Sequence, residues 1–484
     1  MAGIGINLNR IFEKNTVTAN LVGYSYSTVA TIAPMILVIG NTLLMNAVFD
    51  VSSLNYSARA LYTCTVLYLF IFSLLTAAPF NAVLSKYLSD VIYEERYEDI
   101  LPCFNMGLFF NVLFSCVLGV PFCLWEFFVG KVALWYVFTG FCGYASLVLV
   151  FYSMLYLSIC KDYSKISLFF LIGMGMAFGM AALLIYGFHW EITYSMLLGL
   201  SSGFLLIACL ETALVKSYFR VGSKNYRGVL HYFKKYWQLV FINFLYVLGL
   251  YLHNFVFWTT DLHTVVAHTF VCAEPYDLAS CLAMFTSLSA STIFIALVEM
   301  HFHEKYKAYS EAVIGGSLEQ IEKTKKRMFS QLAAELTNII RIQFVISAVL
   351  YFLVMILAPR YGFSGLGMRI YPCLAAGYFI LFMLYAEVIF LYYFSDTTGL
   401  MLTSSIFCLV TLAGSIAATH FTPEWYGMGL CAGAFAGWCM AYARLRWVEK
   451  NIDTHIFCQG SLLKRGGGVK PSEIVYNVYK KTQK

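Results

Sequence analysis

The chain has 484 residues, of which 60% are hydrophobic, 18% aromatic and only 12% charged. A water-soluble fold of this length could not bury so much apolar surface, so soluble enzymes and soluble binding domains are excluded. The net charge of +6 comes from 32 lysines and arginines against 26 acidic residues, and their placement indicates membrane topology rather than nucleic-acid binding.

Twelve apolar stretches are long enough to cross the bilayer, because a helix needs about 20 residues to span roughly 30 Å of hydrocarbon. They cover residues 21–48, 61–83, 104–129, 132–159, 166–187, 192–215, 237–258, 278–300, 337–357, 371–394, 397–418 and 426–447. These stretches are too long and too uniformly apolar for the alternating strands of an outer-membrane barrel. We therefore expect an all-α, polytopic membrane protein with about twelve transmembrane helices.

The basic residues predict which side of the membrane each loop occupies. All but four of the 32 lysines and arginines precede the first span, follow even-numbered spans or follow the last one. The four exceptions are Arg59, Lys131, Arg360 and Arg369. Because cytoplasmic loops carry an excess of Lys and Arg, we expect both termini to be cytoplasmic. The predicted location is the cytoplasmic (inner) membrane, as a multi-pass protein.

Charge and length divide the chain into two halves. The predicted parts are an N-terminal bundle of spans one to six (1–215), a basic cytoplasmic linker (216–236), a C-terminal bundle of spans seven to twelve (237–447, with a cytoplasmic loop at 301–336) and a basic cytoplasmic tail (448–484). Two six-helix bundles joined in this way are typical of transporters built from two related halves. In the loop, Ser317 and Gln320 fit a capping box, so we expect an amphipathic helix along the membrane surface that leads into span nine.

Spans one and seven carry an unusual number of polar residues. Span one contains Pro34, Asn41 and Asn46, and asparagine is costly in lipid unless it faces protein or water. Span seven contains a similar set: Asn243, Tyr246, Tyr251, His253 and Asn254. The two spans occupy equivalent places in the two halves, so we expect them to line a central polar cavity between the bundles. The alternative is that these groups pair across helix contacts and never meet a substrate.

Glycines at four-residue spacing predict close helix contacts in two spans. They are Gly175 and Gly179 in span five, and Gly429, Gly433 and Gly437 in span twelve. Glycine at this spacing lets helix backbones approach each other closely. Packing within the chain is the simpler interpretation, and self-association is the other.

Glu387 lies near the middle of span ten, where an ionisable group is costly and indicates function by default. It could carry a proton or contact a cationic substrate; the alternative is a hydrogen-bonded glutamate that holds two helices together. Glu126, Glu211 and Glu299 lie near span ends and are expected to be interfacial. There is no Walker A motif and no trustworthy metal-ligand spacing, so we expect neither an enzyme nor a cofactor or metal site.

Three charged segments resemble the PelG family, the membrane transporters of Pel exopolysaccharide systems. They are MAGIGINLNRIF at the start, FNAVLSKYLSDVIYEERYEDIL at 80–101 and LVEMHFHEKYKAYSEAV at 297–313. The resemblance implies a fold similar to the multidrug/oligosaccharidyl-lipid/polysaccharide exporter superfamily. It also implies an exported polymer rich in N-acetylhexosamine and partly cationic. The implied partners are a cytoplasmic glycosyltransferase and the membrane scaffold subunits of a Pel-like complex.

The leading hypothesis is therefore an exporter that passes a polysaccharide substrate across the cytoplasmic membrane between two helix bundles. Two other functions stay open. One is a cation-coupled multidrug-type antiporter of the same superfamily, and the other is a non-transporting membrane scaffold of a polysaccharide synthase. The expected surroundings are the lipid bilayer and protein partners, with no nucleic acid.

Overall fold

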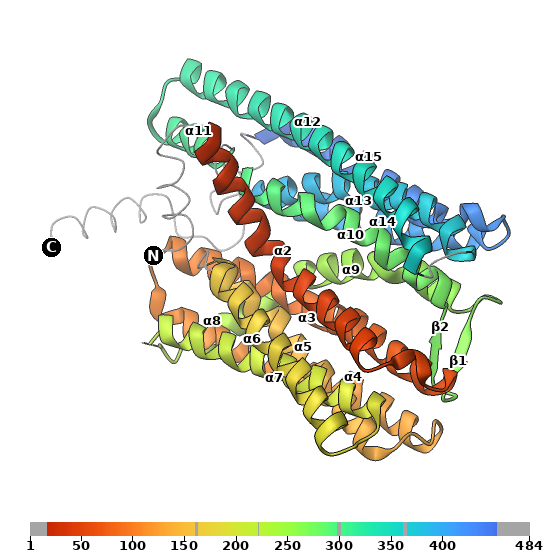
Figure 1. Ribbon diagram of the computed structural model, residues 1–484. Coiled ribbons are helices and arrows are strands. Elements are labelled where there is room, and N and C mark those ends of the chain that lie inside the picture. The colour runs from red at the N-terminus through yellow and green to blue at the C-terminus, as the bar shows by residue number, and fades with distance from the viewer. Residues whose placement is uncertain (1–16, 160–162, 221, 298–301, 362–364, 453–484) are drawn as a thin grey trace.

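The computed structural model describes residues 17–159, 163–220, 222–297, 302–361 and 365–452. In this part of the chain the architecture is all-α apart from one two-stranded hairpin (Figure 1). The first 16 residues and most of the predicted tail lie outside the described residues.

Six long helices form the N-terminal half. They are α2 (Val17–Val48), α3 (Tyr56–Tyr93), α4 (Ile100–Phe128), α5 (Leu134–Ile159), α6 (Tyr163–Ala182) and α7 (Ile192–Tyr218). A π-helical turn at Leu183–Gly187 extends α6. The linker contains the short helix α8 (Tyr226–Lys235), which begins where the Asn225 side chain accepts a hydrogen bond from the Gly228 amide at 3.1 Å.

The C-terminal half contains seven helices and the hairpin. They are α9 (Trp237–Phe257), β1 (Thr264–Val266), β2 (Phe270–Cys272), α10 (Glu274–Leu297), α11 (His303–Gly315), α12 (Leu318–Leu357), α13 (Leu366–Tyr393), α14 (Thr397–Ala418) and α15 (Met428–Ile452). Each predicted span overlaps one long helix. Within the described residues, nine helices are long and apolar enough to cross a membrane. The multi-pass helical fold is confirmed, and the count of twelve spans stays a prediction.

The loop before span nine differs from the expectation. The capping box is confirmed, because the Ser317 amide donates to Gln320 Oε1 at 3.1 Å and the Gln320 amide donates to Ser317 Oγ at 3.3 Å. The helix that starts there does not end at the membrane, and α12 continues for 40 residues. At 1.5 Å per residue this is about 60 Å, roughly twice the hydrocarbon thickness. The helix leads into span nine as expected, but it is continuous with that span, so the expectation that it lies along the membrane surface is wrong.

The two halves repeat the same packing. In the first half the neighbouring pairs are α2–α6, α3–α4, α3–α5, α4–α5, α5–α7 and α6–α7. The corresponding pairs of the second half are α9–α14, α10–α12, α10–α13, α12–α13, α13–α15 and α14–α15. The contacts between halves form a matched pair as well, α3 with α9 and α10 with α2. The structure therefore contains the internal repeat expected of many transporters, although the boundaries at residues 215 and 236 stay a prediction.

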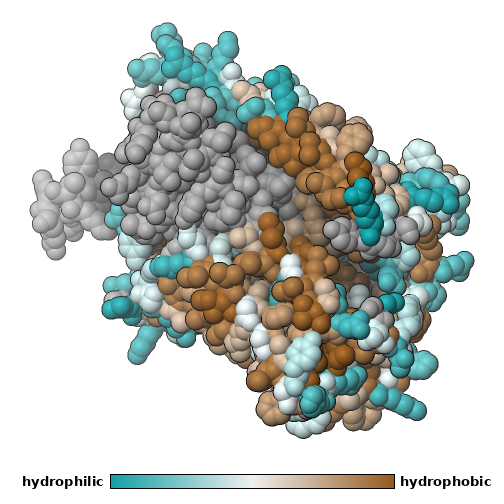
Figure 2. Space-filling view, in the orientation of Figure 1, coloured by the Kyte–Doolittle hydropathy of each residue, from teal (hydrophilic) through white to brown (hydrophobic). Residues whose placement is uncertain are grey.

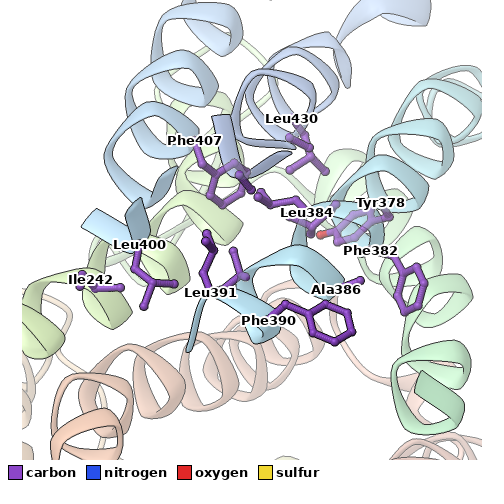
Figure 3. Packing of buried hydrophobic residues seen from close by; sticks show 14 of the residues in the cluster. Ile242, Tyr378, Phe382, Leu384, Ala386, Phe390, Leu391, Leu400, Phe407 and Leu430 are labelled. Carbon is purple, nitrogen blue, oxygen red and sulfur yellow. The ribbon is translucent and has the colours of Figure 1, made fainter. Parts of the chain in front are cut away.

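Each half has an apolar interior, and the cluster of the C-terminal half also includes Ile71 and Val83 of α3. In the C-terminal half, Leu384 of α13, Phe407 of α14 and Leu430 of α15 meet in one buried cluster (Figure 3). The N-terminal half has two clusters, one centred on residues such as Phe104 and Tyr152. Large hydrophobic side chains also cover the outside of the bundles, as lipid-facing helices require.

The two ends of the molecule carry different elements and are more hydrophilic than its middle. Helices α8 and α11 lie at one end of the molecule, and the β1–β2 hairpin lies at the other (Figure 1). Hydrophobic side chains occupy the middle of the face in Figure 2, and hydrophilic ones gather toward the two ends. This is the surface of a protein that spans a bilayer. We refer to the hairpin end as the outer end and to the α8 end as the inner end, following the predicted topology.

Only one of the two glycine predictions is confirmed. In α15, Gly429 packs on Ser415 and Gly433 packs on Thr411, so both glycines let α15 approach α14. In α6, Gly175 and Gly179 face open space among the described residues, so packing within the chain is wrong there and self-association stays a prediction. The glycine that makes the close contact there is Gly173, against the backbone of α7.

Candidate functional site

The α3–α9 contact joins the two halves, and we call it the seam. Aromatic residues fill its outer part. The Tyr68 ring of α3 stacks on Trp258 at the end of α9, with centroids 5.2 Å apart and planes at 2°. One turn further in, Phe72 stacks on Phe255 at 6.1 Å. Two successive stacked pairs close this part of the seam.

The hairpin closes the outer end of the seam. It belongs to the C-terminal half, because it connects α9 to α10, yet it packs on α3. The Tyr68 hydroxyl donates to the Val271 carbonyl at 2.9 Å and accepts from the Val271 amide at 3.1 Å. Phe270 inserts its ring between Tyr68 and Phe122 of α4, with centroid distances of 5.0 and 5.4 Å. The hairpin is thus bound to the N-terminal half by both hydrogen bonds and ring contacts.

A buried carboxylate fixes the base of the hairpin. Asp277 of α10 accepts hydrogen bonds from Asn254 Nδ2 at 2.7 Å, from the Trp258 indole at 2.9 Å and from the Ala273 amide at 2.9 Å. The same Trp258 ring stacks on Tyr68, so the aspartate also orients the aromatic pair of the seam. Buried carboxylates are stable when several donors satisfy their oxygens, as here.

A second polar group lies deeper in the C-terminal half. His253 Nδ1 lies 2.8 Å from the Tyr276 hydroxyl, while its Nε2 is buried without a hydrogen-bond partner among the described residues. Ser280 Oγ lies 3.0 Å from the Tyr378 hydroxyl and 3.5 Å from Asn254 Oδ1. These contacts tie α9, α10 and α13 together, so the predicted path residues His253 and Asn254 pair inside the C-terminal half.

Asn243 is the predicted path residue that lies directly at the seam. Its side-chain amide donates to the Ala78 carbonyl of α3 at 2.5 Å, which joins the two halves. Nearby in the sequence of α3, Asn81 has a buried carbonyl oxygen without a hydrogen-bond partner among the described residues. The sequence reasoning missed Asn81, because one asparagine near the end of a predicted span (61–83) is unremarkable.

The other predicted path residues are scattered. Asn41 is buried between α2 and α6, where its amide contacts the sulfur atoms of Met45 and Met174 at 3.6 and 3.7 Å. Asn46 is exposed on α2. Tyr246 packs near Phe407 of α14, with ring centroids 5.8 Å apart. Tyr251 is buried in the core of the C-terminal half. The structure therefore does not gather the eight predicted residues around one point, and their role as a path stays a prediction.

Two buried glutamates each bridge a pair of helices. Glu387 of α13 is 4% exposed and accepts from the Trp438 indole of α15 at 3.0 Å. Glu211 of α7 is fully buried and accepts from Ser153 Oγ of α5 at 2.6 Å. In each carboxylate the second oxygen is buried without a hydrogen-bond partner among the described residues. Glu126 is also buried within the protein. The expected position of Glu126 and Glu211 near the membrane interface stays a prediction, and Glu299 lies outside the described residues.

The two glutamates lie at the same depth in the repeated fold. Helix α5 approaches α7 where Gly143 meets Ser201, and α13 approaches α15 where Gly377 meets Cys431. Glu211 lies ten residues after Ser201 in α7, and Glu387 lies ten residues after Gly377 in α13. Each half thus has one carboxyl group between two corresponding helices. The glutamate belongs to α7 in the first half and to α13 in the second.

The comparisons with known proteins now identify the family. The family model described as "PelG: Putative exopolysaccharide Exporter (EPS-E)" matches residues 1–457. The chain belongs to the PelG family. Among curated proteins, no relative matches it at a significant level.

Solved structures with the same fold are transporters of the MOP superfamily. A multidrug resistance MATE family transporter gives a TM-score of 0.56 and 14% identity in its outward-facing conformation, and 0.56 and 13% in its inward-facing conformation. A MOP superfamily transporter from Pyrococcus furiosus, whose binding pocket is described as having reverse polarity, gives a TM-score of 0.55 and 15% identity. Each comparison covers 88% of this chain and 96% of the other. This PelG family member is therefore a multi-pass membrane transporter by family and by fold.

The residues that close the seam were largely outside the predicted site. Asp277 appeared in the sequence as one acidic residue of an outer loop, and Tyr68 as one aromatic residue of an apolar span. Their pairing depends on contacts across about 200 positions, such as the hydrogen bonds between Tyr68 and Val271. The only local signal was the Asn254–Trp258 spacing, which places both side chains on one helix face one turn apart.

Proposed function

We propose that this protein exports an exopolysaccharide across the cytoplasmic membrane, and that the polymer passes between the two halves. The match of the PelG family model over residues 1–457 is the observation that carries the proposal. The repeated packing supports it, because the described contacts between the halves are concentrated in two helix pairs, α3–α9 and α2–α10. Two rigid bundles joined in this way can tilt relative to each other without losing their own cores.

The seam is the proposed outer gate. When the halves tilt apart at the outer end, the Tyr68–Trp258 and Phe72–Phe255 stacks separate, and the freed ring faces can pack on the apolar faces of sugar units. Asn243 and Asn81 then offer amide groups to sugar hydroxyls. The fixed Asp277 network keeps Trp258 oriented during this change, because its donors all belong to the C-terminal half. The polymer is proposed to be Pel-like, rich in N-acetylhexosamine and partly cationic.

The inner end is the proposed docking surface for the rest of a Pel-like complex. Helix α8 carries Lys234 and Lys235 in its last turn, and it is held by Tyr232, whose hydroxyl donates to Asp90 of α3 at 3.0 Å. The first part of α12 extends beyond the length of a membrane span. These elements give a cytoplasmic glycosyltransferase and membrane scaffold subunits a structured surface beside the entrance of the path.

The proposal is tested by secretion of extracellular polymer in a strain whose chromosomal copy is deleted. We expect secretion to be lost and to return with the plasmid-borne protein. Undiminished secretion in the deletion strain would refute export. A deletion that instead raises sensitivity to cationic drugs, with normal polymer, would favour the multidrug-type antiporter.

A pair of asparagine variants separates transport from scaffolding. Asn243→Leu removes the amide at the seam, and we expect polymer secretion to fall by about tenfold. This corresponds to about 1.4 kcal/mol, the size of one lost hydrogen bond. Asn111→Leu is the matched control, because Asn111 is buried and donates to Gly107 O at 2.8 Å within its own helix. Equal secretion from both variants, with the complex still assembled in a pull-down, would support the scaffold function instead.

A further inference from the structure

Two cysteines from different halves meet at the outer end of the seam. Cys64 lies on α3 and Cys272 ends β2, and their sulfur atoms are 2.9 Å apart. They are 208 positions apart in the sequence. Neither side chain is engaged in a disulfide in this structure, and both are buried, at 2% and 6% exposure. A pair this close needs no backbone movement beyond a small adjustment of the side chains to become covalent.

The surroundings hold the two thiols together. The hydrogen bonds between Tyr68 and Val271 fix β2 to α3 one residue before Cys272 and one helical turn after Cys64. Val266 and Phe270 complete a small apolar cluster around the pair. The Cys64 thiol donates to the Cys272 sulfur, and this hydrogen bond lowers the pKa of Cys272, which favours the thiolate needed for exchange.

We propose that Cys64 and Cys272 are a site of reversible oxidation whose disulfide staples the two halves together at the outer end. The oxidant is a disulfide of a thiol oxidoreductase or of a small thiol compound. The Cys272 thiolate attacks one sulfur of that disulfide and releases one thiol, and Cys64 then attacks the mixed disulfide and releases the second. One S–S bond forms, one breaks, and the oxidant takes up two electrons and two protons.

The location of the pair favours oxidation and gives the disulfide a mechanical effect on the two halves. The hairpin lies at the end opposite α8, and the predicted topology directs that end toward an oxidising compartment, where disulfides persist. Since the pair is buried, exchange takes place while the hairpin is lifted from α3. Once formed, the bond ties a loop of the C-terminal half to a helix of the N-terminal half, so the outer gate of the proposed exporter cannot open.

A second cysteine pair provides the control. Cys431 Sγ of α15 lies 3.3 Å from the Cys373 carbonyl of α13, so these two residues are also neighbours near the outer end. Both belong to the C-terminal half, and a bond between them would leave the halves free to separate. Cys373→Ser therefore matches Cys64→Ser in chemistry and differs in what the cysteine can connect.

The test uses the full-length protein in membranes, incubated with oxidised glutathione and then alkylated with N-ethylmaleimide. We expect mass spectrometry to find a peptide pair joined through Cys64 and Cys272, present in Cys373→Ser and absent in Cys64→Ser and Cys272→Ser. Recovery of both cysteines as alkylated thiols from the wild-type protein would overturn the proposal. The decisive measurement needs only the wild-type chain, so it stands if a variant does not fold.

A second readout tests the staple itself. Hydrogen exchange of the hairpin amides, such as that of Val271, is expected to slow by about tenfold after oxidation and to recover with dithiothreitol, because the closed state becomes tethered. Unchanged exchange in a protein shown to carry the bond would refute the mechanical role. The inference rests on the proposed function only for its effect on the gate. If the Cys64–Cys272 disulfide forms but its reduction leaves polymer secretion unchanged, the oxidation site stands and its role in gating is contradicted. The loss of export expected in the deletion strain does not depend on either cysteine, so the proposed function is tested separately.

Discussion

The two halves share one packing plan but distribute their polar groups differently. Between α5 and α7 the N-terminal half places Glu211 against Ser153, and between α13 and α15 the C-terminal half places Glu387 against Trp438. The C-terminal half adds a second polar network around Asp277. On α2, the helix of the first half that corresponds to α9, Asn41 meets only two thioethers among its described contacts. The comparison shows that apolar packing determines the helix arrangement that the halves share, while a few buried polar contacts make the halves different.

The inner ends of the halves show the same contrast. Asp396 caps α14, and its carboxylate receives two hydrogen bonds from Arg444 of α15, both at 2.9 Å. At the matching place in the first half, Lys165 of α6 donates to the Tyr218 hydroxyl of α7 at 2.5 Å, near the surface. The first contact is buried on its acidic side and the second is exposed. Burial, more than the presence of a charge, should decide how much each contact stabilises the protein.

The largest expected effect comes from breaking the buried ion pair. Arg444→Ala leaves the fully buried Asp396 carboxylate without its main partner, and we expect the free energy of unfolding in detergent to fall by about 3–5 kcal/mol. Lys165→Ala at the equivalent place should cost less than about 1 kcal/mol, because the contact is exposed. Thermal unfolding followed by size-exclusion chromatography checks both. Equal losses would show that the two inner ends are equivalent after all.

The next effect concerns the glycines of α15 and α6. Gly433→Ala forces a methyl group against Thr411 and its backbone, so we expect a loss of about 1–3 kcal/mol in unfolding free energy. Gly175→Ala has open space and a better helix former, so a gain of up to about 1 kcal/mol is expected. The same thermal assay measures both signs. Destabilisation by the α6 variant would mean that this face of α6 packs against something in the membrane.

A smaller effect should separate the two buried glutamates. Glu387→Gln keeps an acceptor for the Trp438 indole, so folding should change by less than about 1.5 kcal/mol. We nevertheless expect polymer secretion to fall about tenfold, because a neutral amide can neither carry a proton nor attract a cationic sugar. Glu211→Gln is the matched variant in the other half and should secrete normally. Full secretion by Glu387→Gln would assign that glutamate to helix packing alone.

The smallest effect is expected at the exposed outer pair of Arg369 and Glu424, which form an ion pair. The Arg369 guanidinium lowers the pKa of Glu424 to about 2. A carboxyl with a depressed pKa stabilises the fold above its unfolded pKa of about 4.3 and stops doing so as the pH falls toward 2. The difference in thermal midpoint between wild type and Arg369→Ala should therefore be slight at pH 7 and shrink below pH 4. A difference that grows on acidification would contradict this assignment, and Glu424→Gln should remove the pH dependence.

Local rules predicted the helices well and the site poorly. The capping box at Ser317 and Gln320 was readable because it involves residues three apart. The glycines of α15 were readable for the same reason, yet the identical spacing in α6 faces outward. Spacing shows that several small residues share a face, but the face that meets another helix depends on how the bundle is assembled. For the same reason the sequence showed that the predicted path residues are polar, while the neighbours that each of them meets could be seen only in the structure.

By itself, the sequence determined that this protein crosses a membrane many times as helices, because a bilayer accepts only long apolar segments with satisfied backbones. Its charged loops also carried the resemblance to the family that the comparisons establish. Only the tertiary structure decided which polar groups meet. It brought Cys64 to Cys272, Tyr68 to Val271 and one carboxyl group to the same helix pair in each half. Such contacts join residues far apart in the chain, and hydropathy along the sequence carries no information about which distant face a side chain will find.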